Sequence, residues 1–297
     1  MLNHASEAKA ALSATFDFFF VPVFCFFSVW LSRLADIRPK QYIDKAKSRD
    51  RGELRPRSPF NMDQKPLLIF DGDDTLWRTM PIYSQAKRDF FQLMRRQGFA
   101  TKKVEIYFEE RDRSNVKTLG FSRRRFGLSM QQTYRHFSRL ANRPIRRSVV
   151  KRITTIRDGI FQRQPELAPF AKSVLQSLAL GNRLVLLTKG TKRIQLQRVS
   201  ASGLAHFFEK VLVVKDKDNE TFREIVKRLK MKAANTWSVG DSLRSDINPA
   251  LRGGLNAIWI PNANWKYEED VLLESQRFYK IQSLRQVIAI VNKIGSD

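Results

Sequence analysis

The 297-residue chain contains one cysteine, Cys25, and three histidines, His4, His136 and His206. A single cysteine excludes an intramolecular disulfide and any metal site made of several thiolates. The three histidines are far apart in the sequence, whereas imidazole metal ligands normally work in groups, so we expect surface or packing roles for them. Carboxylates are therefore the metal ligands that this sequence has to offer.

Long apolar runs are also scarce. The main one, 18–31, has 14 residues and contains Pro22, whereas a membrane-spanning helix needs about 20 apolar residues. Basic residues cluster after this run rather than before it, which is unlike a cleavable signal. By the positive-inside rule that basic flank stays in the cytoplasm. We therefore expect a cytoplasmic protein, with segment 10–32 as a marginal membrane attachment.

A simpler interpretation of residues 1–61 is that they precede the folded domain. Met62 stands directly before the first strand-like run, and residues 36–60 are charged and contain Pro39, Pro56 and Pro59. Such a segment has too few apolar residues for a core of its own. We expect 1–61 to be an extension or linker that catalysis does not need.

Acidic residues are few compared with basic ones. The chain has 54 Lys and Arg but 29 Asp and Glu, a formal charge of +25. The excess is concentrated in 78–163, which has 22 basic and 6 acidic residues. Such a surface attracts phosphorylated metabolites, nucleic acid or acidic lipid headgroups, although a basic face can also serve solubility alone.

From residue 65 onward, short apolar runs alternate with amphipathic stretches. Strands are predicted at 67–70, 183–187, 211–214, 236–239 and 256–260, and helices at 171–180, 191–202, 221–229 and 247–252. Apolar runs without period-2 alternation are typical of strands that are buried on both faces. The pattern predicts an α/β fold with a Rossmann-like parallel sheet.

Residues 80–165 interrupt this alternation. They contain no convincing buried strand, and helical periodicity is visible at 83–96, 130–140 and 147–161. We therefore predict an α/β core made of 62–79 and 166–297, with an all-helical segment, 80–165, inserted after the first strand.

Polar side chains follow four of the predicted strands. They are Asp71, Asp73 and Asp74 after the first strand, Thr188 after the second, Lys215 and Lys217 after the third, and Asp241 and Asp246 after the fourth. The carboxyl ends of parallel strands meet at one edge of the sheet, where ligands usually bind. Carboxylates, a hydroxyl and an ammonium group at one edge indicate a magnesium-dependent phosphoryl-transfer site.

The sequence 70–77, Phe-Asp-Gly-Asp-Asp-Thr-Leu-Trp, resembles the opening motif of the haloacid dehalogenase (HAD) superfamily, and the other three blocks follow in that family's order and spacing. The resemblance covers about 62–290. It implies that Asp71 is a nucleophile that forms an aspartyl phosphate. It also implies that Asp73 is the general acid and base that marks the phosphatases of the family. Asp74 stands where these phosphatases often have glycine, and we expect it to face solvent or to cap the next segment.

The resemblance also implies a phosphate-binding group. The hydroxyl of Thr188 and the backbone N–H groups of Lys189 and Gly190 would hold phosphate oxygens. A lysine would offset charge between the nucleophile and the phosphoryl group. Lys217 lies 24 residues before Asp241 and fits the family spacing best, with Lys215 as the alternative.

The implied cofactor is Mg²⁺. Its ligands would be Asp71, the backbone carbonyl of Asp73, and Asp241, because magnesium takes a few protein oxygens and keeps water and substrate oxygens as its other ligands. Asp246 is either a further ligand or a group that positions water and Lys217. The helical segment 80–165 stands where the family has a cap that closes over the site. Its basic clusters are Arg123-Arg124-Arg125, Arg146-Arg147 and Lys151-Arg152.

These observations favour a Mg²⁺-dependent phosphatase that acts on a phosphorylated small molecule. One alternative is the same chemistry on a nucleotide or nucleic-acid end, with the basic cap following the phosphates. A second is a non-catalytic basic binding module on the same fold, because a fold alone does not imply a function. A mutase also remains possible, whereas the phosphonate hydrolases of the family lack an equivalent of Asp73.

Overall fold

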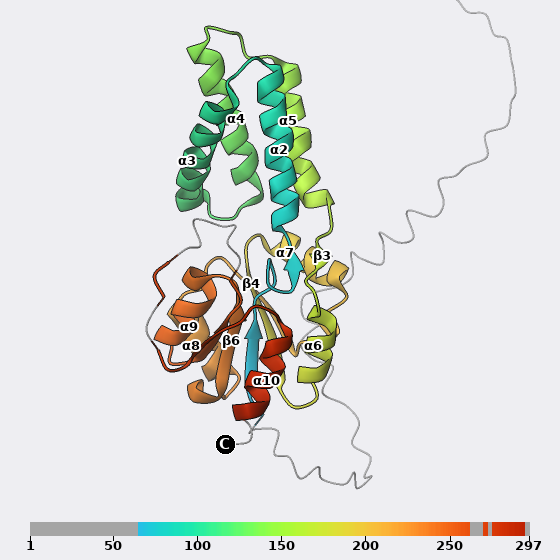
Figure 1. Cartoon of the computed structure of the whole chain (residues 1–297), viewed down its shortest axis with the longest axis vertical. Coiled ribbons are helices and arrows are strands. Elements are labelled where there is room, and N and C mark those ends of the chain that lie inside the picture. Colours follow the sequence, from blue (N-terminus) through green and yellow to red (C-terminus); the bar gives the residue numbers. More distant parts are fainter. Residues whose placement is uncertain (1–64, 262–269, 273–274, 295–297) are drawn as a thin grey trace, which may run out of the picture. The chain divides into compact units, whose positions relative to one another are not determined.

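The computed structural model describes residues 65–261, 270–272 and 275–294. Six strands form one parallel sheet in the order β5-β4-β1-β6-β7-β8 (Figure 1). They are β1 (Leu67–Phe70), β4 (Arg183–Lys189), β5 (Lys210–Val214), β6 (Thr236–Gly240), β7 (Asn256–Trp259) and β8 (Phe278–Lys280). The predicted α/β fold with a parallel Rossmann-like sheet is confirmed.

Strand β1 lies inside the sheet, between β4 and β6. Its first residue, Leu67, pairs with Arg183 and Thr236, and its last, Phe70, pairs with Leu186 and Val239. All four residues of β1 are buried, which explains an apolar run without alternation. Because the three strands are parallel and in register, the residues that follow them meet at one edge.

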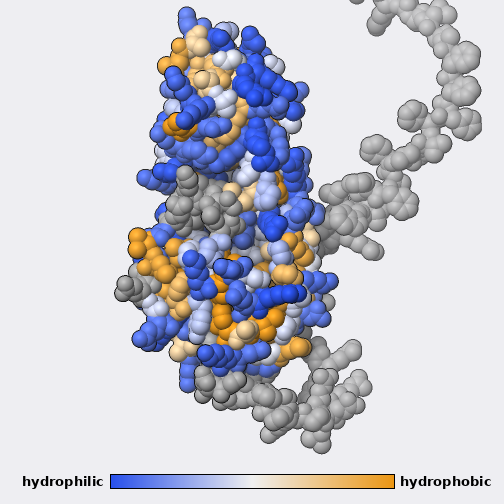
Figure 2. Space-filling view, in the orientation of Figure 1, coloured by the Kyte–Doolittle hydropathy of each residue, from blue (hydrophilic) through white to orange (hydrophobic). Residues whose placement is uncertain are grey.

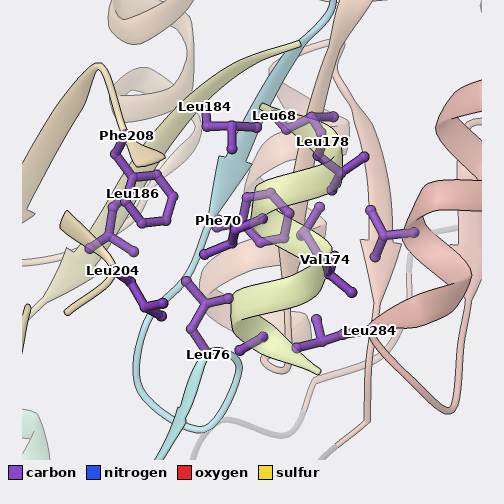
Figure 3. Close-up of a cluster of buried hydrophobic side chains, with 14 of the residues drawn as sticks. Leu68, Phe70, Leu76, Val174, Leu178, Leu184, Leu186, Leu204, Phe208 and Leu284 are labelled. Carbon is purple, nitrogen blue, oxygen red and sulfur yellow. The ribbon is translucent and has the colours of Figure 1, made fainter. Parts of the chain in front are cut away.

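Helices cover both faces of the sheet. Side chains alternate along a strand, so Leu68 and Phe70 of β1 face one layer, in a cluster with α6 (Ala171–Leu178) and α10 (Arg285–Ile294) (Figure 3). Leu67 and Ile69 face the other layer, which contains α8 (Asn219–Arg228) and α9 (Asn248–Arg252). Full burial of each leucine or phenylalanine stabilises the fold by about 1.5–3 kcal/mol. The strand β8 and the helix α10 were not among the predicted elements.

Between β2 (Trp77–Arg78) and β3 (Glu166–Leu167) the chain forms four α-helices, which we call the four-helix unit. They are α2 (Met80–Arg96), α3 (Thr101–Leu119), α4 (Arg123–Leu140) and α5 (Arg147–Gln162). Their apolar faces enclose a core of their own that includes Phe90, Phe108, Phe126, Met130 and Ile153. Helix α2 packs on α5 and α3 packs on α4 (Figure 1). Each of the three helices predicted within 80–165 is present.

Helix α3 had no prediction of its own, and its buried face shows why. That face consists of Val104, Phe108, Asp112 and Asn115. Half of it is polar, so the apolar periodicity fails midway. Asp112 is paired with Arg125 of α4 and also accepts a hydrogen bond from Ser129 Oγ at 2.7 Å. A buried polar network thus occupies a position where the sequence pattern leads one to expect apolar residues.

The chain passes between the sheet and the four-helix unit twice. The outward segment, β2 (Trp77–Arg78), pairs antiparallel with the returning segment, β3 (Glu166–Leu167). The two crossings therefore form a short hydrogen-bonded ribbon. Among the described residues, no helix combines the length and the apolar character needed to cross a bilayer. The predictions for 1–61 and 10–32 lie outside the described residues.

Candidate active site

Asp71 directly follows β1 and is 8% exposed. Its backbone N–H donates to the carbonyl of Val239 at 2.9 Å, so the last hydrogen bond of the β1–β6 pair fixes its position. The carbonyl of the next residue, Gly72, accepts hydrogen bonds from the backbone N–H groups of Leu76 and Trp77 and closes a tight turn. A Cβ at Gly72 would stand 2.5 Å from the ring of Trp77, so the turn requires glycine.

Of the two candidate lysines, Lys217 is the one that contacts the acidic residues. Its ammonium group donates to Asp71 Oδ1, and to Asp246 Oδ1 at 2.6 Å. Lys217 is 3% exposed, whereas the alternative, Lys215, is exposed to solvent. Burial alone would lower the pKa of Lys217, but the two carboxylates outweigh burial and raise it. The ammonium group is therefore held in its charged form between two acids.

Three carboxylates, those of Asp71, Asp241 and Asp246, lie together at this edge, with one oxygen of each within 4.8 Å of the others. Burial raises the pKa of Asp71 to about 7, even though Lys217 acts in the opposite direction. Burial, and then the charges of Asp71 and Asp246, raise the pKa of Asp241 well above its ordinary value. One lysine does not balance three acids, of which Asp71 and Asp246 are buried and Asp241 is half-buried. The cluster thus has the hard oxygen ligands and the excess negative charge that suit a divalent cation such as Mg²⁺.

Local geometry places Asp246 in this cluster. It lies in the π-helical turn Leu243–Ile247, and its Oδ2 accepts the backbone N–H of Ser242 at 3.1 Å. Gly240, at the end of β6, lets the carboxylate approach, because a Cβ there would stand 2.4 Å from Asp246 Cγ. The sequence predicted Asp246 near a helix start, and the structure shows why a glycine precedes Asp241.

Asp73 does not join the three carboxylates. Its Oδ1 accepts a hydrogen bond from Trp77 Nε1 at 2.6 Å, and its Oδ2 accepts from Gln195 Nε2 at 2.9 Å and from Arg198 at 2.5 Å. Burial opposes the charge of Arg198, but Asp73 and then Tyr83 raise the pKa of that guanidinium. The carboxyl group of the expected proton donor is thus held by three hydrogen-bond donors.

Sequence reasoning missed Gln195 and Arg198. Both lie on α7 (Lys192–Ser202), three residues apart, so they share one side of the helix. Both are buried although they are polar. The sequence did contain a signal for these two residues. A helix is predicted to begin directly after Thr188–Gly190, so the first turns of that helix lie at the same edge of the sheet.

The Thr188–Gly190 segment agrees only in part with the expected phosphate site. Thr188 is 1% exposed at the end of β4 and borders the cleft. Lys189 Nζ donates to Ser245 Oγ at 2.5 Å. The backbone N–H of Gly190 donates to the carbonyl of Val214 at 3.0 Å and is therefore engaged in the sheet. Its φ of 138° explains why the position requires glycine.

Asp74 caps the four-helix unit instead of facing solvent. Its carboxylate accepts hydrogen bonds from the backbone N–H of Thr79 at 2.8 Å and of Met80 at 2.9 Å, at the start of α2. Its φ of 65° is left-handed, which fits a position where the family often has glycine. Of the two expected roles, capping is the one observed.

A cleft joins these groups to the four-helix unit. The residues of 80–162 that line it are aromatic: Tyr83, Phe121 and Phe161. The ring of Phe121 lies over the core, with Lys189 Nζ at 4.5 Å from its centroid. The described basic clusters of the unit do not line the cleft. Arg124, Arg146, Arg147, Lys151 and Arg152 are exposed, on a unit whose visible face is mostly hydrophilic (Figure 2).

The Arg123–Arg125 cluster is divided between two environments. Arg123 is half exposed and lies 3.4 Å from Asp158. Arg125 is 1% exposed and paired with Asp112 inside the unit. The described cation that faces the cleft beyond the two lysines is Arg198, which comes from the core. The basic residues of the four-helix unit therefore do not supply the positive charge of the cleft.

A family model of haloacid dehalogenase-like hydrolases matches residues 68–260. The chain belongs to this family. The resemblance inferred from the four motifs is thereby confirmed. Among solved structures, a haloacid dehalogenase-like family hydrolase from Xanthomonas campestris has a TM-score of 0.64 and 25% identity, covering 79% of this chain and 100% of its own.

Several further relatives of this HAD-like hydrolase match most of its length, and others match a shorter part. Glyceraldehyde 3-phosphate phosphatases from Methanopyrus kandleri and Methanocaldococcus jannaschii are 24% and 25% identical, over 77% of this chain and 98% of theirs. Human N-acylneuraminate-9-phosphatase is 31% identical over 32% of this chain and 40% of its own. The HAD-hydrolase YfnB from Bacillus subtilis, a structure bound to magnesium, has a TM-score of 0.55 at 20% identity, over 77% of this chain and 99% of its own, which shows the fold alone.

Proposed function

We propose that this protein is a Mg²⁺-dependent phosphatase that hydrolyses a phosphate monoester of a small molecule through an aspartyl-phosphate intermediate. The observation that carries the proposal is the contact of Lys217 with Asp71 inside a cluster of three carboxylates, two of which are buried. Curated relatives over the same length are phosphatases, which supports the reaction type. All the reactive groups that the family motifs call for are present in this sequence. Their presence argues against a non-catalytic binding module.

The reaction divides into two displacements at phosphorus. An oxygen of Asp71 attacks the phosphorus, the bond to the ester oxygen breaks, and the leaving oxygen takes a proton from Asp73. In the second step water gives a proton to Asp73 and attacks the phosphorus, and the bond to Asp71 breaks. The sum is ester plus water giving alcohol plus phosphate. When bound, Mg²⁺ supplies positive charge for the phosphoryl oxygens.

The other residues of the site bind and orient. Asp71, Asp241 and Asp246 would hold the metal, and the backbone carbonyl of Asp73 is the fourth proposed ligand. Lys217 fixes Asp71 and offsets negative charge during transfer. Thr188, with the backbone N–H of Lys189, would bind phosphate oxygens. The four-helix unit would act as a cap whose aromatic residues keep water from the cleft.

The exposed basic clusters do not favour nucleic acid as the substrate. They lie outside the cleft, so they offer no path that leads a polyanion to Asp71. A phosphorylated small molecule remains the proposed partner.

The proposal is tested by phosphate release from p-nitrophenyl phosphate with and without Mg²⁺. We compare the wild type with Asp71→Asn and Asp73→Asn, and with Glu110→Gln as a surface control for the same change of carboxylate to amide. We expect both site variants to lose at least about a hundredfold in kcat, and the control to keep its rate. If Asp71→Asn keeps more than about a tenth of the wild-type rate, the covalent mechanism is wrong.

A second readout follows the intermediate itself. Mass spectrometry of acid-quenched wild-type protein should find a phosphate on Asp71 during turnover, and a larger fraction in Asp73→Asn if water attack is slowed. A phosphate on another residue would contradict the assignment.

A further inference from the structure

We propose that Arg198 determines specificity for substrates that carry a second anionic group, and that such a group replaces Asp73 as its partner and releases Asp73 for proton transfer. The inference rests on the proposed function of the site. It concerns a residue of α7 that none of the four sequence motifs contains.

The first step is the position of Arg198. The residue is 8% exposed, and its guanidinium lines the cleft and contacts Asp73 Oδ2. A buried guanidinium needs an anionic partner, because an unpaired buried charge is strongly unfavourable. In this structure that partner is a residue that the reaction requires elsewhere.

The second step is the state of Asp73. Both of its oxygens accept hydrogen bonds, one from Trp77 and the other from Gln195 and Arg198. A carboxyl group that gives a proton to a leaving oxygen must place one of its oxygens against that atom. At least one of these contacts must therefore open during the cycle, and in the exchange that we propose it is the contact of Oδ2 with Arg198.

The third step is the charge available to a substrate. Lys217 is engaged with Asp71 and Asp246, and Lys189 contacts Ser245 and the ring of Phe121. Among the described cations of the cleft, Arg198 is the one that stands beside the proton donor rather than beside the metal-binding carboxylates. A carboxylate or second phosphate on the substrate would find its partner there.

The fourth step is that Arg198 remains paired with an anion throughout the exchange. When a substrate anion takes the place of Asp73, Arg198 keeps an anionic partner and is never left buried alone. Nearby, Gln195 Oε1 is buried without a hydrogen-bond partner among the described atoms, so it is an unused acceptor for a donor such as a substrate hydroxyl. A substrate with an uncharged tail would leave the Arg198–Asp73 pair closed and would turn over more slowly.

The test uses substrates of one carbon skeleton. Glycerol 3-phosphate has a neutral tail, 3-phosphoglycerate ends in a carboxylate, and propane-1,3-diol bisphosphate ends in a second phosphate. We measure kcat and KM in Mg²⁺ for the wild type, Arg198→Gln, Arg198→Lys and the control Arg193→Gln. Arg193 is an exposed arginine of the same helix, so the control makes the same charge change away from the cleft.

The wild type and Arg193→Gln should prefer at least one of the two anionic substrates by about tenfold or more in kcat/KM, as expected for a charge-assisted contact. Arg198→Gln should reduce that preference to about twofold, and Arg198→Lys should keep part of it. Preference for the carboxylate or for the second phosphate identifies the anion. An equal loss of kcat on all three substrates, with the preference unchanged, would overturn the proposal and leave Arg198 as a support for Asp73.

A binding measurement separates this inference from the proposed reaction. Calorimetry without Mg²⁺, which prevents turnover, measures how much more tightly the preferred anionic substrate binds than glycerol 3-phosphate. This ratio should be larger for Asp73→Asn than for the wild type, because no carboxylate competes for Arg198. An unchanged ratio would overturn the exchange even if Arg198→Gln fails to fold. If no phosphate ester is hydrolysed but this shift is found, the proposed function fails while the anion site stands.

Discussion

Lys217 donates a hydrogen bond to Asp71 although the strands that precede them, β5 and β1, are not neighbours in the sheet. Strand β4 lies between them, so the side chain of Lys217 reaches past the end of β4 to meet Asp71. Two residues earlier, Lys215 stays in solvent. The spacing of this lysine from its strand therefore decides whether it takes part in the site.

Replacing each lysine by methionine tests this relationship. Lys217→Met should lose at least about a hundredfold in kcat, because the charge that offsets Asp71 and the phosphoryl group is gone. It should also lower the free energy of unfolding by about 3–5 kcal/mol in the absence of Mg²⁺, since two buried carboxylates lose their cation. Lys215→Met should leave both quantities nearly unchanged. Turnover and urea unfolding are the measurements, and a stronger effect at Lys215 would refute the assignment.

Gly240 gives a test of the carboxylate cluster in which no acidic or basic residue is replaced. A Cβ at this position would overlap Asp246, so Gly240→Ala should push that carboxylate away from Asp241. We expect Mg²⁺ affinity to fall by about tenfold or more, as is typical when the partners of a metal site are disturbed. Gly159→Ala in α5, where a Cβ meets nothing within 4 Å, is the control. Equal Mg²⁺ affinities in the two variants would show that the close approach is unimportant.

The raised pKa of Asp71 predicts how Mg²⁺ stabilises the fold. In the metal-free protein this pKa is raised from 3.8 to about 7. The folded state then holds more protons than the unfolded state, so the contribution of Asp71 to stability is fully present below its unfolded pKa and is lost as pH rises through about 7. In the proposed function, Mg²⁺ would bind the ionised carboxylates and replace the proton. The increase in Tm on adding Mg²⁺ should therefore be several degrees larger near pH 8 than near pH 5. An increase of the same size at both pH values would contradict the prediction, and Gly159→Ala should behave like the wild type.

Two neighbouring arginines of α4 lie in different environments, so replacing each by alanine should change the stability of the protein by very different amounts. Arg125→Ala should destabilise the protein by about 3–5 kcal/mol, because it leaves Asp112 buried without its partner. Arg124→Ala changes an exposed side chain and should stay within about 0.5 kcal/mol. Denaturant midpoints measure both. Equal and small effects would mean that the Arg125–Asp112 pair does not support the four-helix unit.

The parallel sheet and the gathering of Asp71, Asp241, Asp246 and Lys217 were predictable because strand ends in such a sheet converge by geometry. The orientation of Asp73 was not, since Gln195 and Arg198 belong to a helix more than 100 residues away in sequence and the contact exists only in the folded chain. The engagement of the Gly190 N–H depends likewise on the neighbouring strand, β5. Net charge was the poorest guide, because it counts basic residues without showing which of them face the cleft.

The antiparallel pairing of Arg78 with Glu166 brings the entry and the exit of the four-helix unit to adjacent points. An inserted segment with adjacent ends can be exchanged for one of another length or sequence without cutting the host sheet. In natural or laboratory recombination, the four-helix unit could therefore be exchanged as one piece, because its two connections to the core lie side by side. A transplanted unit would bring new walls to the cleft, while Arg198, being part of the core, would remain with the reactive groups.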